Sequence, residues 1–316
     1  MRNPEWTGRI AAINSEGRSL PALLGELENR QTNAWPELRE GIDALRQIEY
    51  RQLDVNGASI SLQHNPRRIV SSSARVDQKS IAERPCFLCP ANLPKEEQGI
   101  EFGEAFVLLF NPMPVLPSHI VAVYEEHVPQ RIAGCVSAFL KLTAALGEGF
   151  AVIYNGPRCG ASAPDHLHFQ AVSSARLPIL EDGNLENYPA RFLLLVHEDE
   201  GVLEQKLKCV VQTLAEISDP GSDPGEEPMI NLMATVREGK IRIYIFPRSK
   251  HRPESFFRTG EDQRMISPAA LDLAGIVVAP RRADFDRLTD SELGGIFTEV
   301  TLGTSQFETL SRHLKC

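Results

Sequence analysis

Residues 150–172 read FAVIYNGPRCGASAPDHLHFQAV, two apolar stretches joined by a loop rich in Gly, Pro and Ser. Both stretches have the length and composition of buried β-strands. The loop lets the backbone approach a ligand closely and present its amide donors. Polar and apolar residues alternate in the second stretch, so His166, His168 and Gln170 are predicted to share one face of a strand. Because burying such a cluster costs desolvation, we expect it to bind a ligand; surface histidines on an edge strand are the alternative.

Apolar periodicity on both sides of this segment predicts alternating strands and helices. Strands are expected at 105–110, 119–124, 150–155, 166–172, 191–198, 229–236, 240–247 and 271–280, and helices at 136–150, 202–217 and 289–302. Thr289 is expected to cap the last helix, and the turn formers at 218–228 predict a loop. Both parts share a strand–helix–strand–strand order, so we expect an α+β protein with two similar halves, in which helices flank an antiparallel sheet.

The N-terminal 55 residues are expected to be helical. Apolar residues recur there at three- and four-residue spacing, in 20–30 and again in 35–53. Asn56-Gly57 then predicts the turn of a hairpin over 55–65. A short extended piece is expected at 65–70.

Composition excludes several classes of function. The chain has 316 residues, of which 42% are hydrophobic and 24% charged, as in soluble globular proteins. No apolar run approaches the ~18 residues of a membrane span, and the N-terminal MRNPEWTGRI lacks an apolar signal segment. We therefore expect a cytoplasmic protein without a membrane partner. The net charge of −9 argues against a nucleic-acid partner.

Two of the six cysteines form a close pair. Cys86 and Cys89 lie in a Pro-rich stretch at the spacing of zinc ligands; a redox pair or two buried thiols are the alternatives. His119 and His166 open two predicted strands, and if those strands are neighbours both imidazoles can meet the cysteines. A site with four protein ligands and no open position would be structural. His127 is a competing third ligand.

An anionic ligand in an acidic protein needs local positive charge. Arg67, Arg68 and Arg75 precede the cysteine pair, and Arg158 lies inside the Gly-rich loop. A second cluster, which begins with Arg248 and Lys250 and continues with His251 and Arg252, follows the predicted strand at 240–247. Arg suits bidentate contacts to phosphate. Solvated surface charges are the alternative for each residue.

Four blocks occur in an order that is specific as a set. The blocks are Asn65-Pro66 with Val70-Ser71 and Arg75, Cys86–Asn92 (CFLCPAN), Phe110-Asn111-Pro112 with Pro117-Ser118-His119, and Gly160–Gln170. This set resembles the galactose-1-phosphate uridylyltransferase branch of the histidine-triad superfamily. The stretch 111–123 (NPMPVLPSHIVAV) is more similar to the dinucleoside-polyphosphate phosphorylases and GDP-hexose phosphorylases of that superfamily, and to a bacterial family related to them. Leu167 stands where the family has Pro, and one extra residue separates Ser162 from the histidines.

The resemblance implies a role for each matched residue. It implies a structural zinc on Cys86, Cys89, His119 and His166, a nucleophile at His168 that attacks an α-phosphorus, and Gln170 on the non-bridging oxygens. The expected substrate-binding residues are Arg75, Asn111, Asn155, Arg158, Gly160, Ser162, Arg248 and Lys250. It also implies a division into a helical N-terminal extension (1–60), a first histidine-triad-like half with the zinc knuckle and active-site strand (61–180), and a second such half (181–316).

The expected activity is that of a nucleotidyltransferase or phosphorylase that forms a covalent nucleotidyl-histidine. Its substrate would be a nucleoside diphosphate sugar or a dinucleoside polyphosphate, and its acceptor phosphate or a sugar phosphate. Gln170 has no proton to give, which favours transfer over hydrolysis by analogy with the family. A hydrolase on the same fold and a non-catalytic, zinc-stabilised nucleotide-binding protein are the alternatives, and the sequence leaves a homodimer open.

Overall fold

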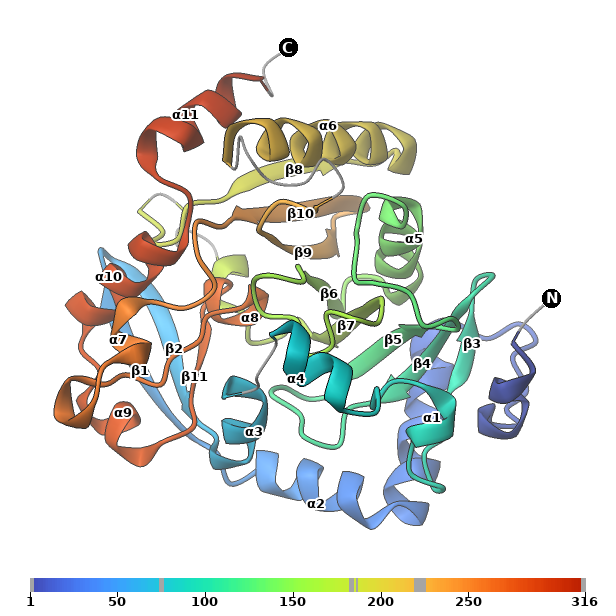
Figure 1. The fold of residues 1–316 in the computed structure, drawn as a ribbon. Coiled ribbons are helices and arrows are strands. Elements are labelled where there is room, and N and C mark those ends of the chain that lie inside the picture. The colour runs from blue at the N-terminus through green and yellow to red at the C-terminus, as the bar shows by residue number, and fades with distance from the viewer. Residues whose placement is uncertain (1–2, 74–76, 182–184, 186, 219–225, 314–316) are drawn as a thin grey trace.

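The computed structural model (Figure 1) describes residues 3–73, 77–181, 185, 187–218 and 226–313. The strands are β1 (Glu49–Val55), β2 (Ala58–His64), β3 (Ile100–Phe102), β4 (Phe106–Phe110), β5 (Ile120–Tyr124), β6 (Phe150–Asn155), β7 (His168–Ser173), β8 (Leu193–His197), β9 (Ile230–Arg237), β10 (Lys240–Pro247) and β11 (Ile276–Ala279). The α-helices are α1 (Leu20–Ala34), α2 (Pro36–Leu45), α3 (Ile69–Ser72), α4 (Gln78–Glu83), α5 (Val136–Leu146), α6 (Glu200–Ser218), α7 (Glu254–Phe257), α8 (Ala270–Leu273), α9 (Arg282–Arg287), α10 (Asp290–Val300) and α11 (Thr304–His313).

An eight-stranded antiparallel sheet forms the centre of the molecule, in the order β3-β4-β5-β7-β6-β9-β10-β8. The series β5, α5, β6, β7 is repeated as β8, α6, β9, β10. The two series meet where β6 pairs with β9, and the strand orders β5-β7-β6 and β9-β10-β8 mirror each other across that pair. The duplicated α+β architecture predicted from the sequence is therefore confirmed.

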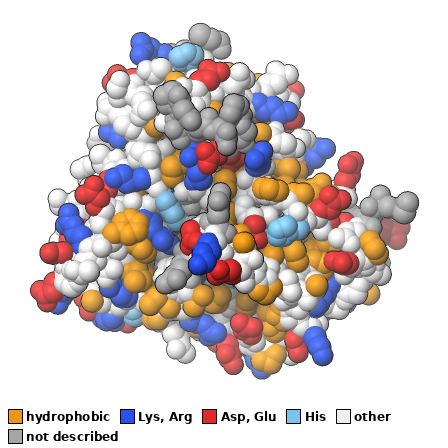
Figure 2. Space-filling model, viewed as in Figure 1, with side chains coloured by type: hydrophobic (Ala, Val, Ile, Leu, Met, Phe, Trp, Pro, Cys, Tyr) orange, Lys and Arg blue, Asp and Glu red, His pale blue; other side chains and the backbone are white. Residues whose placement is uncertain are grey.

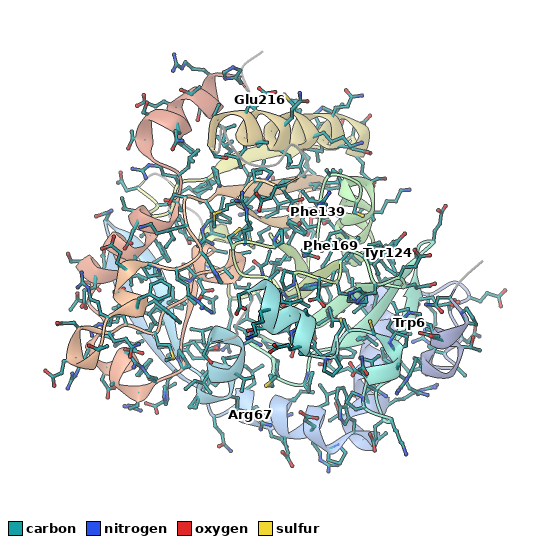
Figure 3. All side chains as sticks on the ribbon, in the orientation of Figure 1. Trp6, Arg67, Tyr124, Phe139, Phe169 and Glu216 are labelled. Atoms are coloured by element: carbon teal, nitrogen blue, oxygen red, sulfur yellow. The ribbon has the colours of Figure 1, made fainter. Side chains whose placement is uncertain are left out.

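Helices cover one face of this sheet. Helices α5 and α6 lie side by side along it (Figure 1), and α5 packs against β7 through Phe139 and Phe169, whose ring centroids lie 5.4 Å apart (Figure 3). Both phenylalanines are fully buried. The odd-numbered residues of β7 thus point toward the helices, and His168 and Gln170 point toward the opposite face.

A small sheet of three strands, β1-β2-β11, covers the opposite face together with α9 and α10, whereas α11 packs against α6. Leu62 of β2 and Val277 of β11 share a hydrophobic cluster with Ile153 of β6 and Met233 of β9. The small sheet therefore packs on the face of β6 and β9 toward which His168 and Gln170 of β7 also point. Figure 2 shows acidic and basic side chains interspersed over one face of the surface. Among the described residues, none of the helices is both long and apolar enough to cross a membrane.

Two sequence predictions about local structure are wrong. Residues 49–55 form strand β1 and not the end of a helix, because β1 pairs with β2 along its whole length. The predicted turn is present between them, with Asn56 at φ 58° and Gly57 at φ 87°. Residues 66–72 are helical and not extended, because Pro66 supplies a fixed φ at the first position of a helical turn.

Further expectations concern where segments begin and end. The predicted strand over 271–280 begins only at Ile276, after helix α8. Thr289 caps α10 as expected, since its hydroxyl accepts a hydrogen bond from the Glu292 backbone N–H at 3.2 Å. Most of the predicted loop at 218–228 falls in 219–225, outside the described residues. The division of the chain at residues 60 and 180 stays a prediction, and residue 60 lies inside β2.

Candidate active site and metal centre

Four side chains that could hold a metal ion meet at one end of β5 and β7. Cys86 and Cys89 come from the loop after α4, His127 follows β5 and His166 precedes β7; their ligand atoms all lie within 4.8 Å of one another. His166 Nδ1 is 3.4 Å from Cys86 Sγ and 3.6 Å from Cys89 Sγ, and His127 Nδ1 is 3.3 Å from Cys89 Sγ. A tetrahedral zinc site separates its sulfur and nitrogen ligands by about 3.6 Å, since Zn–S is about 2.3 Å and Zn–N about 2.05 Å.

In each histidine the other ring nitrogen, Nε2, has a partner that leaves Nδ1 facing the cysteines. His166 Nε2 donates to the Tyr124 carbonyl at 2.8 Å, which leaves its Nδ1 lone pair for a metal. His127 Nε2 lies 3.8 Å from an Asp165 carboxylate oxygen, and Arg84 pairs with the same carboxylate at 3.0 Å. Burial and the neighbouring Cys86 thiol raise the pKa of Cys89 to about 12. The donor set of two sulfurs and two imidazoles therefore fits a bound cation that stabilises the thiolates.

His119, the ligand predicted from the sequence, lies away from this cluster, so that prediction is corrected. Its Nδ1 accepts the Val115 backbone N–H at 3.2 Å, and its Nε2 lies 2.7 Å from Gln170 Oε1. The reason is the length of β5: His119 precedes the strand and His127 follows it, and a five-residue strand is about 17 Å long. The cysteine loop lies at the end where β5 finishes, so His127, the alternative ligand, joins it.

His168 opens β7, and its imidazole is held in one tautomer. Nδ1 lies 2.8 Å from the carbonyl oxygen of His166. A carbonyl can only accept, so Nδ1 carries the proton and Nε2 has a free lone pair. In the described part of the chain Nε2 makes no hydrogen bond. Burial lowers the pKa of His168 to about 4, which keeps the imidazole neutral near neutral pH. His166 itself precedes β7, contrary to the prediction that both histidines lie on the strand.

Gln130 clamps the backbone of His168, a role that the sequence analysis missed. Its Oε1 accepts the His168 N–H at 2.8 Å, and its Nε2 donates to the His168 and Asn155 carbonyls at 3.0 Å each. Gln130 is 1% exposed. The side-chain amide thus replaces a neighbouring strand where β7 begins. Only the close approach of the loop after β5 to β7 reveals this contact, and a glutamine in a loop carries no sequence signal for it.

The Gly-rich loop is held by the second half of the chain. Asn155 Oδ1 accepts hydrogen bonds from Asn231 Nδ2 and from the Ala270 backbone N–H, both at 2.9 Å. Gly160 has φ +109°, and a Cβ there would come within 2.7 Å of the Ala269 Cβ. Glycine is therefore required at 160 both by backbone conformation and by space. These contacts define the shape of the loop before β7.

The remaining loop residues named from the sequence have protein partners. Arg158 donates to the Glu227 carbonyl at 3.2 Å and lies 3.5 Å from a Glu226 carboxylate oxygen. The Ser162 carbonyl accepts from Arg84 at 3.1 Å. Whether the two residues also touch a substrate stays a prediction.

Arg248 is a structural residue and not a phosphate ligand, which corrects a second prediction. It is 1% exposed, and all five of its N–H groups are used. The acceptors are the carbonyls of Val300, Pro268, Lys250 and His251 and the side-chain oxygen of Asn231. The Lys250 ammonium lies 3.0 Å from a Glu299 carboxylate oxygen and 3.9 Å from one of Glu254. Arg248 therefore has no donor left for a phosphate, whereas the role of Lys250, whose side chain is 40% exposed, stays a prediction.

A different cation, Arg68, acts on His119, the partner of Gln170. Arg68, in the turn after β2, donates to the Met113 carbonyl at 3.0 Å and is half-buried. Its charge helps to lower the pKa of His119, to about 3, although burial is the larger cause. Arg68 and His119 thus both bind the loop at 113–115, Arg68 at the Met113 carbonyl and His119 at the Val115 N–H. Arg67 instead donates to the Glu40 carbonyl at the surface (Figure 3). Arg75 lies outside the described residues.

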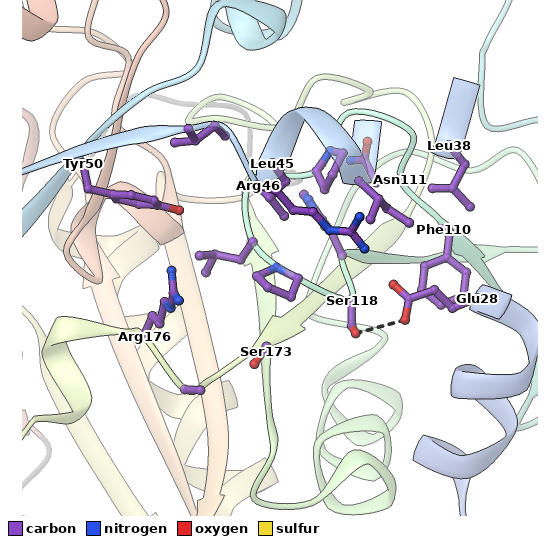
Figure 4. A pocket seen from close by; sticks show the side chains of 17 residues that line it. Glu28, Leu38, Leu45, Arg46, Tyr50, Phe110, Asn111, Ser118, Ser173 and Arg176 are labelled. Carbon is purple, nitrogen blue, oxygen red and sulfur yellow. Dashed lines mark hydrogen bonds between the residues drawn. The ribbon is translucent and has the colours of Figure 1, made fainter. Parts of the chain in front are cut away.

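A cavity of about 580 Å³ adjoins His119 (Figure 4). Its walls come from α1 and α2, from the loop between β4 and β5, and from the residues after β7. Asn111 and His119 line it on the sheet side, and Arg46, Tyr50 and Arg176 line it as well. Ser118 and Glu28 form a hydrogen bond of 3.4 Å in its wall. A volume of this size suits a small-molecule ligand.

Comparisons with known proteins identify relatives of this fold. A family model described as a domain of unknown function (DUF4922) matches residues 27–173, and one described as the GDPGP1-like C-terminal domain matches residues 180–315. The crystal structure of yeast Ap4A phosphorylase Apa2 matches with a TM-score of 0.57 and 18% sequence identity, over 85% of this chain and 97% of that chain. No curated protein matches the sequence.

The same yeast enzyme with bound ligands shows the same likeness. Its complex with AMP matches with a TM-score of 0.53 and 16% identity, over 86% of this chain and 96% of that chain. Its complex with Ap4A matches with a TM-score of 0.52 and 16% identity, over 85% and 97%. The shared fold and the match of residues 180–315 to the GDPGP1-like C-terminal domain agree with the branch that the sequence motifs resemble, that of the dinucleoside-polyphosphate and GDP-hexose phosphorylases.

Proposed function

We propose that the protein is a nucleotidyltransferase of the phosphorylase type, with His168 as its nucleophile. The observation that carries the proposal is the hydrogen bond from His168 Nδ1 to the His166 carbonyl, because it leaves the Nε2 lone pair available. The low pKa of His168, about 4, supports it, since the imidazole needs no deprotonation near neutral pH. The substrate would be a nucleoside diphosphate sugar or a dinucleoside polyphosphate.

The reaction takes place in two displacements at phosphorus. Nε2 attacks the α-phosphorus, an N–P bond forms, and the bond from phosphorus to the leaving phosphate oxygen breaks with its electron pair on that oxygen. An oxygen of inorganic phosphate or a sugar phosphate then attacks the same phosphorus, and the N–P electrons return to Nε2. The Nδ1 proton stays on the ring throughout, and the His166 carbonyl stabilises the positive charge that the ring gains.

Side chains next to His168 suit the charge of a phosphate. Gln170 lies on the same face of β7, two residues along, and its amide can donate to a non-bridging oxygen. Arg68, near the His119–Gln170 pair, can supply a positive charge. Gln170 cannot protonate a leaving group, which favours transfer to a phosphate acceptor over hydrolysis.

The cavity beside His119 suits the nucleoside. Asn111 and His119 line it, whereas Gln170 and His168 do not; because His119 contacts Gln170, we place the base of the nucleotide on the cavity side of that pair. The yeast enzyme of the same fold has been crystallised with AMP and with Ap4A. That likeness supports a nucleotide as the substrate of this protein, and the cavity has the volume to hold its nucleoside.

A zinc ion on Cys86, Cys89, His127 and His166 would be structural, because four protein ligands leave no open position. When bound, it would supply no reacting group and would stabilise the fold of the cysteine loop against β5 and β7. The metal would hold the imidazole of His166 in place. The His166 carbonyl would then stay within hydrogen-bond distance of His168 Nδ1.

The proposal is tested by product formation from a panel of nucleoside diphosphate sugars and dinucleoside polyphosphates, each with and without inorganic phosphate. We expect cleavage that depends on phosphate and yields a nucleoside diphosphate, and a loss of several orders of magnitude in His168→Ala. Cleavage at the same rate without phosphate would instead show a hydrolase. Nucleotide binding with no turnover of any member would favour a non-catalytic nucleotide-binding protein.

A further inference from the structure

We propose that His119 is a positioning residue, which fixes the side-chain amide of Gln170 so that its NH2 group faces the substrate phosphate. This inference rests on the proposed function, because it concerns how Gln170 meets the phosphate beside His168. It gives His119 a part in the reaction in place of the metal-binding role predicted from the sequence.

The tautomer of His119 follows from its two partners. The Val115 backbone N–H, 3.2 Å away, can only donate, so His119 Nδ1 must present a lone pair. A neutral imidazole then carries its proton on Nε2. His119 is 2% exposed and lies near the positive charge of Arg68, and both features favour the neutral ring. Nε2–H is therefore a donor.

The tautomer in turn decides the orientation of Gln170. His119 Nε2 lies 2.7 Å from Gln170 Oε1, so the amide oxygen accepts this hydrogen bond. The opposite orientation would place the amide NH2 against another N–H group, two donors face to face. The NH2 group of Gln170 therefore points away from His119, and among the described residues it has no hydrogen-bond partner.

This direction of the Gln170 NH2 group suits a phosphate ligand. His168, Gln170 and His119 all project from the same face of the sheet, since Gln170 pairs with Val121 and His168 pairs with Val123 across β5 and β7. A phosphate at His168 Nε2 would meet an amide that can only donate. Without the donor at His119, the amide could rotate and present its oxygen to the negative charge, which would slow the reaction.

Two substitutions of similar size separate this role from simple packing. The side-chain amide of His119→Gln can occupy the place of Nε2 and donate to Gln170, whereas that of His119→Asn reaches only the place of Nδ1. We expect His119→Asn to lower kcat by about 10- to 100-fold with little change in KM, and His119→Gln to stay within about threefold of the wild type. The metal content should be unchanged in both variants.

A double-mutant cycle shows whether His119 acts through Gln170. In a Gln170→Ala background, adding His119→Asn should change kcat by less than about threefold, because the side chain that it positions is already gone. Additive losses in the cycle, or equal kcat values for His119→Asn and the wild type, would overturn the proposal. If His119→Asn folds poorly, which its melting temperature reveals, His119→Leu, which also lacks a donor at the place of Nε2, replaces it in the same cycle, and additive losses there would overturn the proposal.

The controls keep this inference separate from the proposed function. Wild-type protein that turns over no nucleotide substrate contradicts the proposed function, and the inference falls with it. Wild-type protein that turns over, alongside a fully active His119→Asn, contradicts the inference alone.

Discussion

The imidazole of His168 donates a hydrogen bond to the backbone carbonyl of His166, with Nδ1 and the oxygen 2.8 Å apart. The imidazole of His166 belongs to the cluster formed with Cys86, Cys89 and His127. One residue therefore offers its side chain to the candidate metal centre and its backbone to the candidate nucleophile. This links the order of the cysteine loop to the orientation of His168.

Metal content should depend on His127 and not on His119. We expect about one equivalent of zinc in purified wild-type protein, a large loss in His127→Ala and Cys86→Ser, and full occupancy in His119→Ala, because only the first two remove a ligand of the cluster. Elemental analysis together with thermal unfolding measures both effects. Full zinc in His127→Ala and loss in His119→Ala would reverse the ligand assignment.

Acid should destabilise the protein through its buried histidines. Burial lowers the pKa of His168 from 6.5 to about 4, so the unfolded chain binds more protons than the folded protein between these values. The contribution to the free energy of unfolding is complete above pH 6.5 and is lost as the pH falls toward about 4. Denaturant unfolding across this range should show a shallower slope for His168→Asn than for wild type. An identical slope would mean that the folded-state pKa of His168 is not lowered.

Loss of the Gln130 side chain, which binds the backbone of His168, should lower both stability and turnover. Gln130→Leu leaves the buried N–H and carbonyl of His168 without their partner, and one unsatisfied buried group costs about 1–3 kcal/mol. We expect a loss of stability of at least that size and a lower kcat, because the start of β7 loosens. Denaturant unfolding and steady-state kinetics measure these effects. Gln212→Leu, on the outer side of α6, is a matched control and should change neither quantity.

Substitution of Arg248 should lower stability, whereas substitution of Arg68 should lower activity. Arg248→Met removes a buried guanidinium with five partners, so it should destabilise the fold by about 3 kcal/mol or more. Arg68→Met should leave most of the stability in place and reduce kcat/KM for the phosphorylated substrates. Unfolding curves and kinetics of the two variants make the comparison. An unstable Arg68→Met with unimpaired kinetics per folded molecule would assign Arg68 to structure alone.

Sequence patterns predict the duplicated fold well, because strand and helix periodicity are local properties. The strands around 150–172 and the repeated strand–helix–strand–strand order need only the alternation of apolar residues. Residues 49–55 were predicted as helix because EYRQLDV continues a helical spacing, yet pairing with β2 forms a strand there. That pairing is a tertiary interaction, which a local pattern does not contain.

At the candidate site, the sequence predicts the types of residue involved but not which of them lie together. Residue types identify Cys86, Cys89 and His166, but the choice between His119 and His127 depends on which end of β5 meets the cysteine loop. A single sequence does not specify that register. For the same reason, Arg248 is a plausible phosphate ligand by residue type, and only its five internal acceptors show that it is structural.

His168 Nε2 should become covalently nucleotidylated during turnover, and isolating the adduct shows whether it does. Wild-type protein is incubated with a dinucleoside polyphosphate or nucleoside diphosphate sugar labelled at the α-phosphate, without an acceptor, and the labelled peptide is mapped by mass spectrometry. We predict one nucleotidyl group on His168, labile in acid, stable in base, and released when phosphate is added. His168→Ala should carry no label and yet keep its metal and fold. Turnover by wild type with no labelled His168, or continued turnover by His168→Ala, would show that His168 is not the nucleophile.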